Sequence, residues 1–149
     1  MLRKSIVETL DAFRKQEIGF AEAEQALKEH KQQAELKRSS VSRAQVPAAD
    51  KSLWEDLIRP GLEVAFQGLV GAAAEGIAYL SSRDQEAYRV AIALAAQAVE
   101  ITEVLEARMG LLSEMTQRFV LTAINPHSDV VQMEQVLTGS AESTLSFLD

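Results

Sequence analysis

The sequence predicts an all-α protein: a helical bundle with a long central antiparallel helix pair and an N-terminal helical hairpin. Three observations predict this class. The 149 residues include 3 prolines, 7 glycines and 5% aromatic residues, a poor supply for sandwiches and barrels. Apolar residues return at alternating spacings of three and four along much of the chain. A serine followed three residues later by Glu or Gln, the spacing of a capping box, precedes several of the expected helices.

Residues 1–37 are expected to form an N-terminal helical hairpin or arm. Ser5 and Glu8 have the spacing of a capping box and open the first helix. Gly19 then separates that helix from a second one, predicted to run from about Phe20 to Lys37. Because the apolar face of both helices is thin, the hairpin should depend on the rest of the protein, or on a partner, for stability.

Residues 38–51 are predicted to be a flexible linker. The stretch is rich in serine and basic residues, contains Pro47 and shows no sustained apolar period. Its beginning, from Lys37 to Val41, would also suit a basophilic protein kinase, because a phosphate there would lie among Arg side chains. A solvated connector is the preferred interpretation.

Residues 52–149 are expected to form the core of the bundle. A capping box at Ser52 opens a short helix, and Pro60 should kink or restart it, since proline fits a first helical turn and not an interior. The next helix is predicted to reach about Leu80. A row of small residues along it would let a neighbouring backbone approach closely. The row consists of Gly61, Ala65, Gly68, Ala72 and Gly76.

A helix from Asp84 to Ala123 is the element around which the rest of the chain is predicted to be organised. It follows a short turn, with a capping box at Ser82, and would therefore lie antiparallel to the preceding helix. At ~1.5 Å per residue it would be roughly 60 Å long, which is more than a small domain needs. Asn125 and Pro126 should end it, before a last helix that reaches Leu137.

The apolar rows of this long helix predict a homodimer. Their flanking residues widen the apolar face beyond what one antiparallel neighbour can cover, and a twofold-related copy is the commonest way to bury the remainder. The small-residue row of the preceding helix would lie at the crossing. The expected interface residues are Leu94, Ala98, Ile101, Leu105, Arg108, Leu112, Met115, Phe119, Gly68, Ala72 and Gly76.

No catalytic, cofactor-binding or metal-binding residue is assigned. The chain has no cysteine, and its two histidines, His30 and His127, lack the Glu-x-x-His spacing of a di-iron bundle. Glu100, Glu103 and Glu106 are neighbours on the long helix, but a solvated face explains them. Neither a phosphate-binding loop nor a dinucleotide-binding motif is present in the sequence. We expect a protein that is not an enzyme and needs no cofactor.

Charge and hydropathy narrow the choice of partner. The net charge of −7 argues against nucleic acid, which requires a clustered excess of Lys and Arg. The apolar run at 60–80 is long enough to cross a membrane, but Glu63 and Glu75 would make its insertion into a bilayer costly. The first residues lack the apolar core of a signal peptide, so we expect a cytoplasmic location.

The leading functional hypothesis is a non-enzymatic protein–protein interaction module. Such an acidic, cysteine-free helical protein would bind itself, another protein, or both, as a homo-oligomer or as an accessory subunit of a larger assembly. Two alternatives remain open. One is a helical bundle that binds a small molecule or a metal, with or without enzymatic activity. The other is a membrane-active or secreted helical protein.

Overall fold

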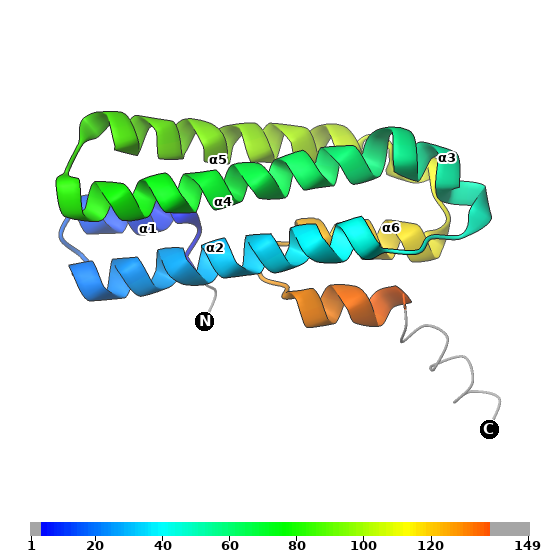
Figure 1. Cartoon of the computed structure of the whole chain (residues 1–149), viewed down its shortest axis with the longest axis horizontal. Helices are drawn as coiled ribbons and strands as arrows, with labels where there is room; N and C mark the ends of the chain where they lie inside the picture. Colours follow the sequence, from blue (N-terminus) through cyan, green and yellow to red (C-terminus); the bar gives the residue numbers. More distant parts are fainter. Residues whose placement is uncertain (1–3, 138–149) are drawn as a thin grey trace, which may run out of the picture.

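The computed structural model describes residues 4–137, and within them the chain is helical with no β-strand (Figure 1). The all-α class and the bundle architecture are confirmed. The main helices are α1 (Ile6–Arg14), α2 (Phe20–Arg43), α4 (Arg59–Ser82), α5 (Gln85–Glu106) and α6 (Glu114–Ile124). Shorter turns are η1 (Ala48–Asp50), α3 (Lys51–Leu53), η2 (Trp54–Ile58) and η3 (Met109–Leu111), and residues 130–137 form a last helical segment.

Helix α4 is the centre of the bundle. It packs along α5 on one side and along α2 on the other, and both neighbours run antiparallel to it (Figure 1). The predicted antiparallel pair is therefore α4 and α5. The two shorter helices complete the bundle, α1 at one end and α6 at the other (Figure 1). They share the position that a single fourth helix would occupy in a four-helix bundle.

The core is divided between these two ends. The α1 end is filled by apolar side chains from α1, α2, α4 and α5, including Leu10, Leu27 and Leu80, which are almost completely buried. The α6 end is filled around Trp54, whose ring meets the Phe119 ring edge-on at a centroid distance of 5.8 Å. Each short helix therefore covers one apolar cluster that the three long helices leave open.

The N-terminal hairpin forms as predicted. Ser5 caps α1 in a complete capping box: its amide donates to the Glu8 carboxylate at 2.9 Å, and its hydroxyl accepts from the Glu8 amide at 3.1 Å. These hydrogen bonds hold the pKa of Glu8 below its ordinary value. Because α1 buries Ile6, Leu10 and Phe13 against the bundle, the hairpin depends on the remaining helices, as its thin apolar face requires.

The single long helix from Asp84 to Ala123 is a wrong prediction. Helix α5 ends at Glu106, the chain turns through η3, and α6 starts after Ser113, whose extended backbone has a ψ of 159°. The heptad pattern continues across this break because both helices pack on the same apolar cluster: Leu105, Leu112 and Phe119 all belong to it. Sequence periodicity reports which residues are buried together, and here it does not distinguish one straight helix from two that fold back.

The second helix is longer than predicted. Helix α2 continues past Lys37 to Arg43, and only 44–47 lie outside a helical segment before η1 begins. Val41 is fully buried in the cluster around Trp54, which explains why the serine-rich stretch remains helical. Lys37 and Ser40 are also buried, whereas Arg38 and Ser39 of the same stretch are exposed.

Two of the three expected capping boxes are not formed. Ser52 lies inside α3, and Ser82 is the last residue of α4; Asp84 instead caps α5 by accepting a hydrogen bond from the Glu86 amide at 3.0 Å. The prediction for Pro60 is correct. It lies in the first turn of α4, directly after the π-helical turn η2, where the lack of an amide hydrogen costs little.

Candidate functional site

The predicted interface residues divide by burial in the single chain. Six of the eleven are buried in it: Ala72, Gly76, Ala98, Leu105, Leu112 and Phe119. Four are half-buried, namely Gly68, Leu94, Ile101 and Met115, and Arg108 is exposed. The buried ones already contribute to the core of this chain. A second copy can therefore reach only the half-buried and exposed members without unfolding the bundle.

The small-residue row of α4 is used inside the chain. A Cβ atom placed on Gly68 would lie 3.7 Å from the Leu94 carbonyl oxygen of α5. A Cβ on Gly76 would lie 3.2 Å from Leu27 Cδ1 and 3.4 Å from Leu10 Cδ2. The close helix approach that these glycines predict therefore occurs, but the neighbours are α5 on one side and the N-terminal hairpin on the other.

A different stripe of α4 faces outward. It contains Val64, Gly71, Ala74 and Ala78, which are exposed except for the half-buried Gly71. Gly71 lies at the seam with α5, because a Cβ on it would be 3.1 Å from Leu94 Cδ1. Val64 precedes Gly71 by seven residues, and Ile101 follows Leu94 by seven. Since the helices are antiparallel, Val64 and Ile101 lie beside the same seam.

We call this surface the outer face: Val64, Gly71, Ala74 and Ala78 of α4 with Leu94, Ile101 and Val104 of α5. These seven residues are apolar, and the exposed Gln67 and the half-buried Glu75 of α4 lie among them. Val64 is 59% exposed and Val104 is 55% exposed, so large apolar groups stand in water at this seam. Single exposed valines need no explanation, but their combination with a smooth row of Gly and Ala gives a surface on which another helix could pack closely.

The most apolar helical stretch of the described residues carries this surface. Ala48–Ser82 contains an 18-residue window with a mean hydropathy of 1.2, and 39% of that window is buried in the chain. By length and composition this stretch could cross a membrane, as the core helix of many soluble proteins also could. The bundle thus leaves a considerable part of its most apolar helix uncovered.

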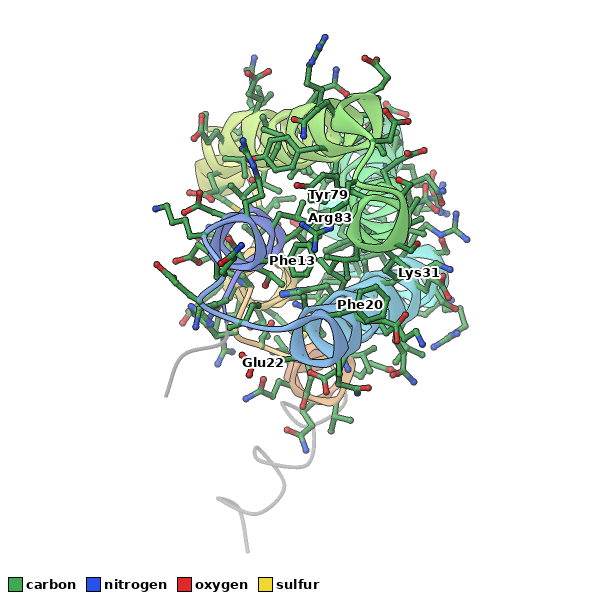
Figure 2. The ribbon with its side chains drawn as sticks, turned by 90° about the vertical axis from the view of Figure 1, so that its left-hand side faces the viewer. Phe13, Phe20, Glu22, Lys31, Tyr79 and Arg83 are labelled. Carbon is green, nitrogen blue, oxygen red and sulfur yellow. The ribbon has the colours of Figure 1, made fainter. Side chains whose placement is uncertain are left out.

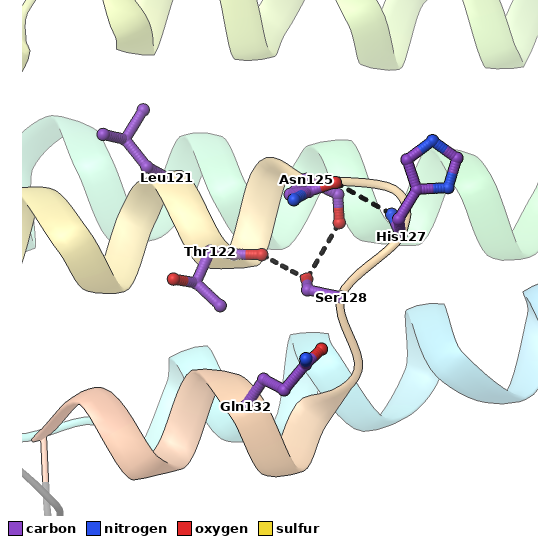
Figure 3. A pocket seen from close by; sticks show the side chains of 6 residues that line it. All are labelled: Leu121, Thr122, Asn125, His127, Ser128 and Gln132. Carbon is purple, nitrogen blue, oxygen red and sulfur yellow. Dashed lines mark hydrogen bonds between the residues drawn. The ribbon is translucent and has the colours of Figure 1, made fainter. Parts of the chain in front are cut away.

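The described residues form two surface pockets, and Val64 of the outer face lines the second of them. One, of about 430 Å³, is lined by polar groups at the end of α6 and by Leu121 (Figure 3). In it, the Ser128 hydroxyl donates to the carbonyl oxygens of Thr122 and Asn125. The Asn125 side chain accepts a hydrogen bond from the His127 amide at 2.9 Å. The other, of about 450 Å³, lies between α2 and α4 around Arg38 and Glu63. In the first pocket, the Ser128 hydroxyl and the Asn125 side-chain oxygen are already hydrogen-bonded to neighbouring groups.

Two buried charged side chains hold α6 at its opposite ends. At the start of α6, Asp50 accepts a hydrogen bond from the Ser113 amide at 2.9 Å, and others from the hydroxyls of Ser113 and Thr116. At its end, the Lys37 ammonium donates to the carbonyl oxygens of Ala123 and Asn125. Both residues are about 95% buried, at 3% and 5% exposure. Their signs match the helix dipole, negative at the N-terminus and positive at the C-terminus.

The Asp50 carboxylate stays ionised in this environment. Burial by itself would raise its pKa, but the hydrogen bonds from Ser113 and Thr116 stabilise the charged form and lower the pKa below its ordinary value. The Lys37 ammonium also donates to the Ser128 hydroxyl at 3.1 Å, which gives it three acceptors within residues 4–137. These arrangements hold a helix in place; no reacting group lies beside them in the described residues.

At the α1 end of the bundle, two arginines stack on aromatic rings. The Arg83 guanidinium lies 4.4 Å from the Phe13 ring centroid, and the Arg14 guanidinium lies 4.3 Å from that of Tyr88. Tyr79 connects the two pairs, since its ring meets Phe13 at 6.2 Å and Tyr88 at 5.3 Å. Figure 2 shows Phe13, Tyr79 and Arg83 gathered at this end. We call the five residues the arginine–aromatic cluster.

Comparison with known proteins adds no functional assignment. No protein-family model matches the chain, and no match was found among curated proteins or among solved structures. Within residues 4–137, no three His, Asp or Glu side chains gather as a group that could hold a metal ion.

Sequence reasoning missed Lys37, Asp50 and the arginine–aromatic cluster. The sequence prediction places Lys37 at the end of the N-terminal hairpin and Asp50 in the linker, and their partners lie more than sixty positions further along the chain. The one available signal was Ser113, a good helix cap in the middle of a supposed helix. The stacking of Arg14 and Arg83 depends on two turns that are close in space but distant in the sequence, so no local sequence pattern predicts it.

Proposed function

We propose that this chain is a non-enzymatic protein–protein interaction module that forms a homodimer through the outer face of α4 and α5. In a larger assembly the same face would make it an accessory subunit. The observation that carries the proposal is the row of apolar residues of the outer face on the most apolar helix, with Val64 and Val104 more than half exposed.

A second copy is the occupant that suits this face best. Val64, Gly71 and Ala78 recur every seven residues, and the small side chains at 71, 74 and 78 allow two α4 helices to approach closely. A twofold axis places each bulky Val64 of one copy over the small residues of the other, so one surface complements itself. The half-buried Leu94 and Ile101, both predicted interface residues, lie at the edge of the same contact.

Sedimentation velocity at micromolar concentration tests the proposal. We expect a species of twice the 16.3 kDa chain mass. Val64→Glu should convert it to the monomer, because the substitution buries a charge in the contact, and it should fold, because Val64 is 59% exposed in the single chain. Val99→Glu is the matched control. Val99 is 54% exposed on α5 but lies about 200° around the helix from Ile101, so the dimer should persist.

A wild-type protein that sediments as the monomer would contradict the homodimer. Dissociation of both variants to the same degree would show that the contact does not lie on the outer face.

Membrane association is the second candidate, and the apolar stretch Ala48–Ser82 is the observation in its favour. Glu63 and Glu75 oppose insertion, and each would cost at least ~2.5 kcal/mol within a bilayer. Co-sedimentation with liposomes separates the two candidates. The interaction module should remain in the supernatant with both neutral and anionic vesicles, whereas a membrane-active protein would pellet.

A further inference from the structure

The backbone of the α4–α5 turn is unusual at Arg83. Its φ is 58°, in the left-handed region, where glycine is the residue that avoids steric cost. A glycine at this C-cap of α4 would adopt the left-handed backbone without the steric cost that the arginine has. Gln16, in the α1–α2 turn at the same end of the bundle, also has a left-handed backbone, with φ at 63°. Backbone strain of this kind is often found where a side chain has a functional role.

The Arg83 side chain lies over an aromatic ring. Its guanidinium lies over the Phe13 ring at 4.4 Å, and Arg14, the next residue of α1, lies over Tyr88 of α5 at 4.3 Å. A guanidinium over an aromatic ring keeps its positive charge, and those of its five N–H groups that are not bonded to a neighbour can donate to an anion. Arg14 also hydrogen-bonds to the Tyr88 side chain, which raises the Arg14 pKa, so Arg83 is the guanidinium with more donors left for an outside group.

The neighbouring carboxylates are engaged with other groups. Asp11 pairs with Lys15 at 2.9 Å, Glu86 pairs with Arg89 at 3.6 Å, and Asp84 caps α5. Across residues 4–137, neither Arg14 nor Arg83 forms an ion pair with a carboxylate, although the chain has 22 acidic residues and 15 basic ones. The Arg83 guanidinium is thus available to an anion from outside the chain, and Arg14, which is bonded to Tyr88, adds positive charge beside it.

We propose that the arginine–aromatic cluster binds a side-chain carboxylate of an acidic segment from a partner protein, with Arg83 as the main contact and Arg14 beside it. Phe20, which is 44% exposed and begins α2 at the same end, offers an apolar contact to a residue next to that carboxylate. The net charge of −7 disfavours long polyanions such as nucleic acid, so a short segment fits best. This surface is separate from the outer face and does not depend on dimerisation.

NMR titration of the full chain tests this site, since the side-chain Nε–Hε resonances of Arg14, Arg83 and Arg89 can each be followed. The probe is a blocked hexapeptide of alternating Glu and Phe, and its control is the same peptide with Gln in place of Glu. We expect saturable shifts at Arg83 and smaller ones at Arg14 with the acidic peptide alone. Arg83→Lys should weaken binding by about tenfold, because lysine cannot form a bidentate pair.

Arg83→Gly separates binding from folding. It relieves the left-handed backbone and removes the guanidinium, so the native amide spectrum should persist while saturable binding is lost. Gln16→Gly is the matched control, which relieves the same kind of backbone and should leave the affinity unchanged.

Three results would overturn the proposal. The first is the absence of shifts at Arg83. The second is an equal response of Arg89, which would indicate unspecific ionic contact. The third is equal affinity for inorganic phosphate, which would make this a phosphate site rather than a carboxylate site.

Discussion

Removal of the Asp50 carboxylate should loosen α6. Asp50 is 3% exposed and accepts three hydrogen bonds from Ser113 and Thr116 at the start of that helix. Loss of a helix cap alone costs about 1 kcal/mol, and donors left without a charged acceptor add to it. Water can reach the half-buried Ser113 and hydrogen-bond to its freed donors, which reduces the loss of folding free energy. We therefore expect Asp50→Ala to lower the free energy of unfolding by about 2–4 kcal/mol.

The size of the effect should depend on the replacement. Asp50→Asn keeps one acceptor oxygen and loses the charge, so it should cost about half as much as the alanine variant. Asp56→Asn is the control, since Asp56 is exposed and its hydrogen bond to Ser52 is long, at 3.5 Å. For a chain of this length, the alanine variant should unfold about 5–15 °C earlier.

Trp54 makes the assay specific. It is the single tryptophan, it is 2% exposed, and its ring contacts Phe119 of α6, so its fluorescence reports whether α6 is in place. Urea unfolding followed by both fluorescence and circular dichroism should show the fluorescence transition of Asp50→Ala moving further than the helix signal. Unchanged stability of Asp50→Ala would refute the assignment of Asp50 as the group that holds α6.

The loss of folding stability at acid pH gives a second test of Asp50. The folded-state pKa of Asp50 lies below the unfolded value, which is about 3.9 for aspartate. The stabilisation is thus complete above the unfolded pKa and is lost as the pH falls through the folded pKa. Asp50→Asn, which cannot titrate, should show a shallower loss of stability below about pH 4 than the wild type. Parallel acid limbs would contradict the lowered pKa.

Three further predictions concern other contacts. Lys37→Met should cost about 2–4 kcal/mol in urea unfolding, because the carbonyl oxygens of Ala123 and Asn125 lose their buried donor, and an exposed-site Lys28→Met control should be neutral. Gly68→Ala should stabilise α4 by about 0.5–1 kcal/mol in thermal unfolding, whereas Gly61→Ala should not, since its Cβ would lie 2.9 Å from Leu105 Cδ2. Limited trypsin digestion should cut first after Arg43, where α2 ends, while the buried Lys37 resists; a first cut at Lys37 would contradict its burial.

The fold class and most helix positions follow from the sequence because they depend on local periodicity and composition. The hairpin at Gly19, the restart at Pro60 and the antiparallel pair of α4 and α5 were all predictable in this way. The break between α5 and α6 was not, since its cause is distant: Asp50 caps a helix that starts 64 positions after it. Local pattern cannot show that a carboxylate from a polar connector ends one helix and begins another.

The predicted interface illustrates a second limit of sequence reasoning. Leu105 and Phe119 look like surplus apolar surface on a long straight helix, but the fold-back buries them in the α6 end of the core. Leu94 and Ile101 stay half-buried at the seam. An apolar stripe identifies what needs to be covered, and only the tertiary arrangement shows whether the same chain covers it.

The central claim, that two copies meet on the outer face, can be tested by spin-label distance measurement. The chain has no cysteine, so a single label can be attached at Ala74→Cys on the outer face or at Val99→Cys, away from it on α5. Double electron–electron resonance should detect an intermolecular distance for labels at position 74 that is clearly shorter than the distance for labels at position 99. No intermolecular coupling at position 74, or a shorter distance at position 99, would contradict the proposed dimer.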